Sequence, residues 1–204
     1  MAQSLSLLYT SHIRGDLWLL PRLHTFLRRL MSGADNVLLL DTGASCSEQV
    51  WHCRATGGRS CLVALDGMGY HAANVADGLD ASQRAKLAQQ VAVGLVDATQ
   101  DWQPPGGEIL VALEPRQSAH RLQICLRTSE STRLEGKALW LQKARAGQVG
   151  EARLELGDSR RIVTAQLHDM PRSTPPNPSI AGLVEFIESE ARRVSPLDGA
   201  TQTL

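Results

Sequence analysis

The chain has 204 residues, of which 43% are hydrophobic, and this is enough for one domain with a sizeable core. Its 21 basic and 21 acidic residues cancel, so the composition offers no strongly basic surface for nucleic acid or an anionic membrane. No segment approaches the roughly 20 apolar residues that a membrane-spanning helix needs. The first residues lack the charged start and apolar stretch of a secretory signal, and we therefore expect a cytoplasmic protein.

Strands and helices alternate in the first part of the chain. Residues 5–10 are typical of a strand, leucines at helical spacing follow Pro21, and residues 37–40 form a second expected strand. Such a strand, helix, strand unit predicts parallel pairing with a right-handed crossover. A helix over 61–68 and a strand over 72–75 repeat the plan.

A third helix is expected over 81–98, because Leu87, Val91 and Leu95 follow a helical repeat. Beyond it the pattern changes to short strands separated by turn-rich segments, and this predicts antiparallel pairing. These expected strands are residues 108–113, 120–126, 138–142, 152–156 and 162–167.

The end of the chain has a different composition. The stretch "MPRSTPPNPS" is a proline-rich connector, and residues 180–194 form an amphipathic helix with Leu183, Phe186 and Ile187 on one side. We therefore divide the chain into a domain at 1–171 and a second part at 172–204, made of connector, helix and a loose tail. This second part either closes the fold or docks a partner, and the sequence leaves both open.

Three segments resemble, in order, the first three motif regions of the calcineurin-like metallophosphoesterases, in the branch of 5′-nucleotidases and UDP-sugar hydrolases. They are "LLYTSHIRGDLWLLPRL", "NVLLLDTGAS" and "ATGGRSCLVALDGMGYHAANVADG". The stretch "GKALWLQKARAGQVGEARLELGDSRRIVTAQLHDMP" resembles the end of that catalytic domain. The resemblance implies an α/β fold, a four-layer α/β/β/α sandwich in which two sheets pack face to face, here trimmed in its central part.

The resemblance also identifies the metal-ligand positions, and most of them carry other residues here. The Asp-x-His pair of the first motif falls on His12 and Arg14, and the bridging carboxylate of the second motif falls on Ala44. In the third motif, Asp77 and Gly78 stand where the family has an amide ligand and a histidine. The later histidine motifs of the family have no counterpart that we can place.

These replacements predict that no pair of metal ions is held. Two divalent ions about 3.5–4 Å apart repel strongly, so a bridging anion must offset the repulsion. Alanine cannot bridge, and the guanidinium of Arg14 stays protonated and cannot ligate a metal. We therefore expect no catalytic residues and no cofactor. A mononuclear zinc or manganese site of His12, Asp41 and Asp77 is an alternative, although Asp41 is more simply explained as ordering its own loop.

Two further clusters each have two interpretations. Arg14, Arg54 and Arg59 could hold a phosphate in a cleft that kept positive charge, or they could pair with acids such as Asp16 and Glu48, which is the simpler expectation.

The stretch "CSEQVWHCRATGGRSC" brings four soft ligands, Cys46, His52, Cys53 and Cys61, into sixteen residues. Its spacing lacks the paired knuckles of zinc ribbons, so we expect a loop with buried free thiols.

Taken together, the sequence favours a noncatalytic pseudo-phosphoesterase that acts as a binding or structural subunit, with an unidentified protein or a second copy of the chain as partner. The alternative is a metal-dependent phosphoester hydrolase similar to 5′-nucleotidases, with an altered site for manganese or zinc. A third option is a metal-free phosphate or nucleotide sensor that uses Arg14. We expect no nucleic-acid partner.

Overall fold

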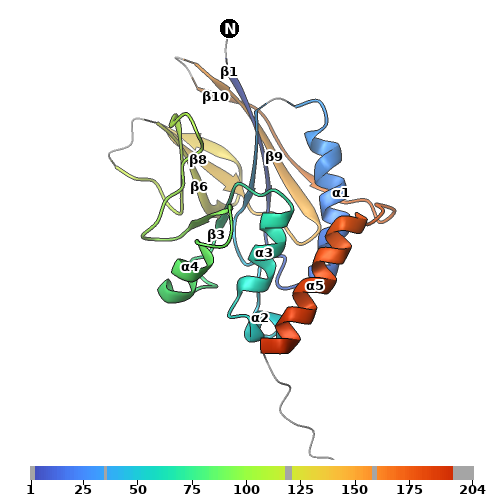
Figure 1. The fold of residues 1–204 in the computed structure, drawn as a ribbon. Helices are drawn as coiled ribbons and strands as arrows, with labels where there is room; N and C mark the ends of the chain where they lie inside the picture. Colours follow the sequence, from blue (N-terminus) through green and yellow to red (C-terminus); the bar gives the residue numbers. More distant parts are fainter. Residues whose placement is uncertain (1–2, 35, 118–120, 158–159, 195–204) are drawn as a thin grey trace, which may run out of the picture.

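The computed structural model of the protein describes residues 3–34, 36–117, 121–157 and 160–194 (Figure 1). The strands are β1 (Gln3–Thr10), β2 (Val37–Asp41), β3 (Ala72–Asn74), β4 (Gly94–Val96), β5 (Ile109–Ala112), β6 (Leu122–Ser129), β7 (Arg133–Glu135), β8 (Ala138–Gln142), β9 (Gln148–Leu156) and β10 (Arg161–Asp169). The helices are the 3-10 turn η1 (Leu17–Leu19), then α1 (Leu20–Met31), α2 (Trp51–Ala55), α3 (Arg59–Gly67), α4 (Ala81–Leu87) and α5 (Pro178–Val194).

Two sheets form the body of the fold. The larger has the strand order β10-β9-β1-β2-β3-β4, and the smaller has the order β5-β6-β8-β7. The predicted parallel pairing of β1 with β2 and of β2 with β3 is confirmed. The mixed α/β fold with two packed sheets is confirmed as well.

The central strand β1 shows why the sheets pack. Alternate side chains of a strand point to opposite faces. Leu5, Leu7 and Tyr9 belong to the core between the two sheets, whereas Leu8 belongs to the core under the helices. Apolar residues on both faces therefore fix β1 in the middle layer.

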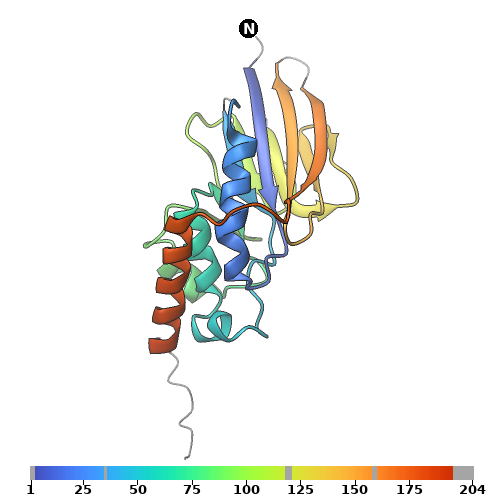
Figure 2. The same cartoon turned by 90° about the vertical axis from the view of Figure 1, so that its right-hand side faces the viewer.

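The helices lie on one side of the larger sheet. Each of the five α-helices contributes buried residues to the core on that face, and α1 and α5 lie side by side there (Figure 2). Within the described ranges, the core between the sheets contains no helical residue. Among the described residues no helix covers the outer face of the smaller sheet, so the outer helical layer predicted on that side is absent there.

Two sequence predictions are wrong in this region. The expected antiparallel arrangement after residue 108 holds for β7 with β8 and for β9 with β10, but β5 with β6 and β6 with β8 pair in parallel. The helix expected over 81–98 ends at Leu87, and β4 pairs in parallel with β3. Leu95 and Val96 enter different cores, an arrangement that a strand provides and one helical face does not.

The proline-rich connector and α5 complete the helical layer. The guanidinium of Arg22 donates to the carbonyls of Pro171, Arg172 and Thr174, which fixes the connector along α1. Asn177 caps α5, because its Oδ1 accepts from the Ile180 amide at 3.1 Å. The predicted helix is confirmed, but its buried face consists of Ile180, Val184, Ile187 and Ala191, and Phe186, which the sequence placed on the apolar side, is 60% exposed. The tail at 195–204 lies outside the described residues.

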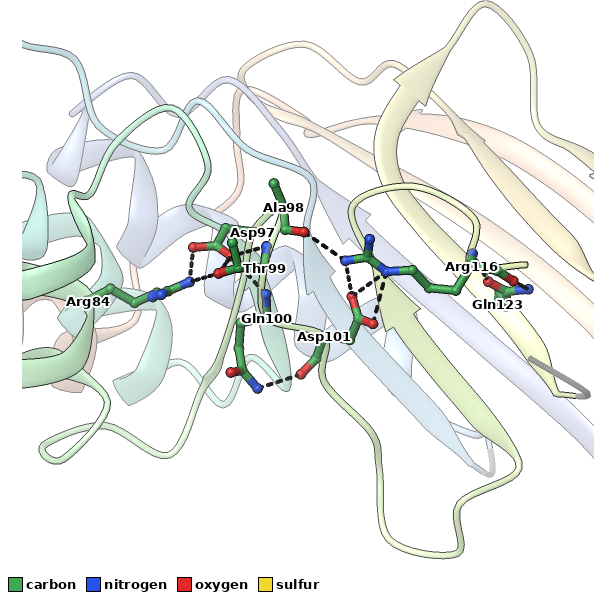
Figure 3. A network of polar contacts seen from close by, with 8 residues as sticks. All are labelled: Arg84, Asp97, Ala98, Thr99, Gln100, Asp101, Arg116 and Gln123. Atoms are coloured by element: carbon green, nitrogen blue, oxygen red, sulfur yellow. Dashed lines mark hydrogen bonds and ion pairs between the residues drawn. The ribbon is translucent and has the colours of Figure 1, made fainter. Parts of the chain in front are cut away.

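A network of polar contacts joins the edge of the larger sheet to the smaller one (Figure 3). Asp101 accepts three hydrogen bonds from the Arg116 guanidinium, at 2.9, 3.1 and 3.2 Å, and the backbone of Arg116 exchanges hydrogen bonds with the side chain of Gln123 on β6. On the other side, Arg84 of α4 pairs with Asp97. No described helix is long and apolar enough to span a membrane.

Candidate functional site

The loops after β1 and β2 run side by side and carry the first two motif regions. The amides of His12, Arg14 and Gly15 donate to the carbonyls of Gly43, Ala44 and Ser45 at 3.0, 2.9 and 2.8 Å. His12, Arg14 and Ala44 all have left-handed backbone angles, with φ of 57°, 54° and 56°. Such angles cost side-chain-bearing residues about 1 kcal/mol or more each, so the surrounding hydrogen bonds must hold them.

Asp41 is fully buried at the base of these loops. Its Oδ1 accepts from the Gly43 amide at 2.9 Å and from the Ser45 hydroxyl at 2.5 Å, and its Oδ2 accepts from the Thr10 hydroxyl at 3.0 Å. Burial raises the pKa of Asp41 to about 6, although these hydrogen bonds oppose the rise. The carboxyl group therefore orders the loop, as the simpler explanation predicts.

A cleft of 530 Å³ opens between the tip of the β1 loop and the ends of β6 and β8. Its charged lining residues are Arg14, Lys143, Arg145 and Glu130. No carboxylate of the described residues forms an ion pair with any of the three cationic residues. The cleft therefore carries an excess of positive charge with hydrogen-bond donors available to an anion.

His12 also lines this cleft, and its ring is held from one side. The hydroxyl of Ser11 lies 2.6 Å from His12 Nδ1. Partial burial lowers the pKa of His12, and the positive charges of Lys143 and Arg14 lower it further. At neutral pH the ring is therefore uncharged, and the three cationic residues supply the positive charge of the cleft.

Asp77 and Gly78 line other cavities. One, of 120 Å³, is bounded also by Ala44 and Cys46, and another, of 810 Å³, is bounded also by Cys46 and Arg54. The structure does not bring His12, Asp41 and Asp77 together, since His12 faces the cleft, Asp41 is buried and Asp77 lies elsewhere. The described side chains gather no group of potential metal ligands around these three.

The three arginines of the anion-binding hypothesis are likewise separated. Arg14 lines the cleft and Arg54 the 810 Å³ cavity, whereas Arg59 lines neither and donates from Nε to the Thr56 carbonyl at 2.9 Å. The expected ion pairs with Asp16 and Glu48 do not occur in the part of the chain that the structure describes. Asp16 instead caps η1 through the Leu19 amide.

Sequence reasoning missed two of the cationic residues in the cleft. Lys143 and Arg145 follow β8, in the "LQKARAG" part of the segment that resembles the end of the catalytic domain. Two basic residues directly after a strand end were the available signal. Only the packing of the smaller sheet against β1 brings them to Arg14.

The prediction of free thiols in the stretch from Cys46 to Cys61 is confirmed, but the predicted loop is wrong, because this stretch contains α2 and the start of α3. The fourth cysteine, Cys125, is free as well. Cys53, Cys61 and Cys125 are buried and Cys46 is half-buried. The sulfur atoms of Cys46, Cys53 and Cys61 nevertheless lie within 4.8 Å of one another, which the sequence spacing did not predict.

No protein-family model and no curated protein matches this chain. Solved structures do match its fold. The NAD nucleotidase of Haemophilus influenzae superposes with a TM-score of 0.62 at 10% identity, over 94% of this chain and 61% of that one. The 5′-nucleotidase precursor of Thermus thermophilus gives a TM-score of 0.59 at 12% identity, over 94% of this chain and 59% of that one.

A putative 5′-nucleotidase from Staphylococcus aureus, solved with α-ketoglutarate, gives a TM-score of 0.61 at 8% identity, over 92% of this chain and 58% of that one. This chain therefore spans about three fifths of the length of the solved chains it matches. At such low identity the likeness shows a shared fold, the metallophosphoesterase fold that the motif order predicts.

Proposed function

We propose that this chain, which has the metallophosphoesterase fold, is a noncatalytic protein that binds a phosphate-bearing anion in the cleft of Arg14, Lys143 and Arg145. The observation that carries the proposal is the meeting of three cationic side chains, without ion-pair partners among the described residues, on one 530 Å³ cleft. A guanidinium binds two phosphate oxygens in fixed geometry, and the lysine adds a point charge.

The donor set supports binding without hydrolysis. Ala44 stands where the motif resemblance implies the bridging carboxylate, and Arg14 stands where it implies a metal ligand. Asp41 uses both carboxylate oxygens within its loop. The remaining groups in the cleft suit an anion better than two cations, because their net charge is positive.

A metal-dependent phosphoester hydrolase is the second candidate. It is favoured by the structural neighbours, which are described as an NAD nucleotidase and 5′-nucleotidases. Such an enzyme would need manganese or zinc on a donor set that includes His12 or Asp77.

A role as a subunit is compatible with either candidate. Trp18 is 55% exposed and Trp51 36% exposed, and both rest on α5, through Glu188 and Arg192 respectively. Exposed aromatic residues favour a protein partner. A protein that stays monomeric and captures nothing from its native lysate would argue against the subunit role.

Calorimetric titration with inorganic phosphate and with a 5′-nucleotide tests the main proposal. Arg14→Ala should weaken phosphate binding by about 2 kcal/mol, roughly 30-fold, because charge-assisted hydrogen bonds are lost. Arg59→Ala is the matched control, since this arginine lines neither cavity, and it should bind phosphate as the unaltered chain does.

Hydrolysis of a chromogenic phosphodiester and of a 5′-nucleotide, assayed with manganese, separates the two candidates. We expect binding without turnover. Turnover that disappears in His12→Ala or Asp77→Ala would overturn the noncatalytic proposal and establish the hydrolase.

A further inference from the structure

Three sulfur atoms converge outside the cleft. Cys46 lies on the loop after β2, Cys53 in α2 and Cys61 in the first turn of α3, and their Sγ atoms all lie within 4.8 Å of one another. Helices α2 and α3 are adjacent in Figure 1. Within the described part of the chain, they form the one group of three histidine, cysteine or acidic side chains whose ligand atoms all lie this close together.

The turn between α2 and α3 sets this arrangement. Gly57 and Gly58 have left-handed φ values of 57° and 82°, and the Gly58 amide donates to the Cys53 carbonyl at 2.7 Å. A Cβ added to Gly58 would come within 2.4 Å of the Gly78 carbonyl oxygen, so this position requires glycine. The reversal places Cys61 beside Cys53 through backbone structure, independently of any ligand.

We propose that Cys46, Cys53 and Cys61 bind one thiophilic divalent cation of the zinc class. Zinc–thiolate bonds of about 2.3 Å place three sulfur atoms about 3.8–4.0 Å apart in tetrahedral or trigonal geometry. The observed separations, all within 4.8 Å, need to close by no more than about 1 Å to reach this geometry. Thiolates are soft ligands and select such ions over magnesium or calcium.

Polar groups around the cluster resemble an outer shell of metal ligands. The hydroxyl of Ser60 lies 3.5 Å from Cys46 Sγ and 2.8 Å from His52 Nδ1, and His52 Nε2 lies 2.9 Å from the Gly15 carbonyl. A carbonyl only accepts, so His52 Nε2 carries a proton that it donates to Gly15. The Ser60 hydroxyl donates to Cys53 Sγ at 3.8 Å, and its contact with His52 orients that hydroxyl toward the cluster.

The three thiols are also linked to one another by hydrogen bonds, and these, together with His52, lower the pKa of Cys53 against the effect of burial. Because a cation binds thiolates, metal binding would release protons from the cluster.

The cluster has a route to solvent. Cys46 and Cys53 line the 810 Å³ cavity together with Arg54 and Asp77. Three protein ligands leave a fourth coordination position, and this cavity gives an exogenous ligand access to it. The site therefore differs from closed structural zinc sites, which use four protein ligands.

Titration of the reduced, chelator-treated full chain with cadmium and then zinc tests the proposal. Cadmium reports on thiolate ligation directly, through its ultraviolet charge-transfer absorption. We expect one ion per chain and displacement of cadmium by zinc. Cys46→Ser, Cys53→Ser and Cys61→Ser should each weaken binding by more than roughly 100-fold, since removing even an outer-shell partner costs 10–100-fold.

Cys125→Ser is the matched control, because Cys125 is a buried free thiol in β6 and belongs to no such cluster. It should bind as the unaltered chain does. Cys46→Ser carries the test if the other two variants unfold, since Cys46 is only half-buried. Equal binding by the three variants, or a reduced protein that binds no metal, would overturn the proposal, as would a disulfide within the cluster that persists under mild reductant.

Discussion

The loop tips of β1 and β2 and the cysteine cluster are neighbouring regions that combine ligands and framework in opposite ways. At the loop tips three amide-to-carbonyl hydrogen bonds join the two loops, and His12, Arg14 and Ala44 stand at the positions where the family resemblance implies metal ligands. In the cysteine cluster no familiar spacing is present, yet three sulfur atoms meet within 4.8 Å. Backbone hydrogen bonds thus hold the loops after β1 and β2 together although the side chains on them are not the expected metal ligands. The Gly57–Gly58 turn, in contrast, brings potential ligands together although their sequence spacing matches no known motif.

The two regions also differ in the charge that they attract. The cleft at the loop tips presents Arg14, Lys143 and Arg145, which suit an anion. The cluster presents thiols that become negative when they lose protons, which suit a soft cation. If both proposals hold, this chain keeps an anion site in the cleft separate from a metal site in the cysteine cluster.

The largest expected effect concerns Asp41, and it tests whether this buried carboxyl stabilises the loops structurally. The pKa of the buried carboxyl is raised to about 6 in the folded state, from an ordinary value of 3.8, so the folded state binds the proton more tightly than the unfolded state does. The stabilisation from this protonation is therefore fully present below about pH 4 and is lost as the pH rises through about 6. Above that pH the free energy of unfolding is lower by about 3 kcal/mol. Asp41→Asn, which keeps one oxygen acceptor and cannot ionise, should remove this dependence.

Urea unfolding at about pH 3.5 and about pH 7.5 measures the effect. The stability of Asp41→Asn relative to the unaltered chain should rise by about 3 kcal/mol between these values. Asp77→Asn, an exposed carboxyl, serves as control. Parallel pH profiles for the Asp41 variant and the unaltered chain would contradict a raised pKa of Asp41 in the folded state.

The next largest effect tests whether zinc binds at the cysteine cluster or at the loop tips. With zinc at about 100 times its dissociation constant, the folded state should gain about 2.7 kcal/mol, which raises Tm by roughly 5–10 °C. His12→Ala should keep this shift and Cys46→Ser should lose it, in scanning calorimetry with and without chelator. A shift that depends on His12 instead would place the metal at the loop tips.

The smallest expected effect concerns Glu130 and tests whether phosphate binds in the cleft. Glu130 is the one carboxylate among the described residues that line it, and it opposes an incoming anion. Glu130→Gln should tighten phosphate binding by about 1 kcal/mol, roughly fivefold, and the gain should shrink as salt increases. Glu114→Gln, a carboxyl outside the cleft, is the control for calorimetry. Unchanged affinity in Glu130→Gln would argue that phosphate binds elsewhere.

Much of the fold could be predicted from local patterns, and the failures have a common cause. The strands around β1 and the helices α1, α3 and α5 follow from apolar spacing, and the motif order predicts the sandwich. The helix expected over 81–98 failed because Leu95 and Val96 are needed in two separate cores, a requirement that no local repeat expresses. Parallel pairing in the smaller sheet was missed for the same reason, since turn-rich spacing does not specify which strand becomes the neighbour.

The sequence by itself determined which side chains stand at the loop tips, among them Ala44, which cannot bridge two cations, and Arg14, which cannot ligate one. It also determined the alternation that buries both faces of β1. Only the tertiary structure decided which side chains meet: Lys143 and Arg145 with Arg14, and Cys46 with Cys53 and Cys61. Such meetings depend on sheet packing and on the Gly57–Gly58 reversal, which bring distant positions together without leaving a periodic signal in the chain.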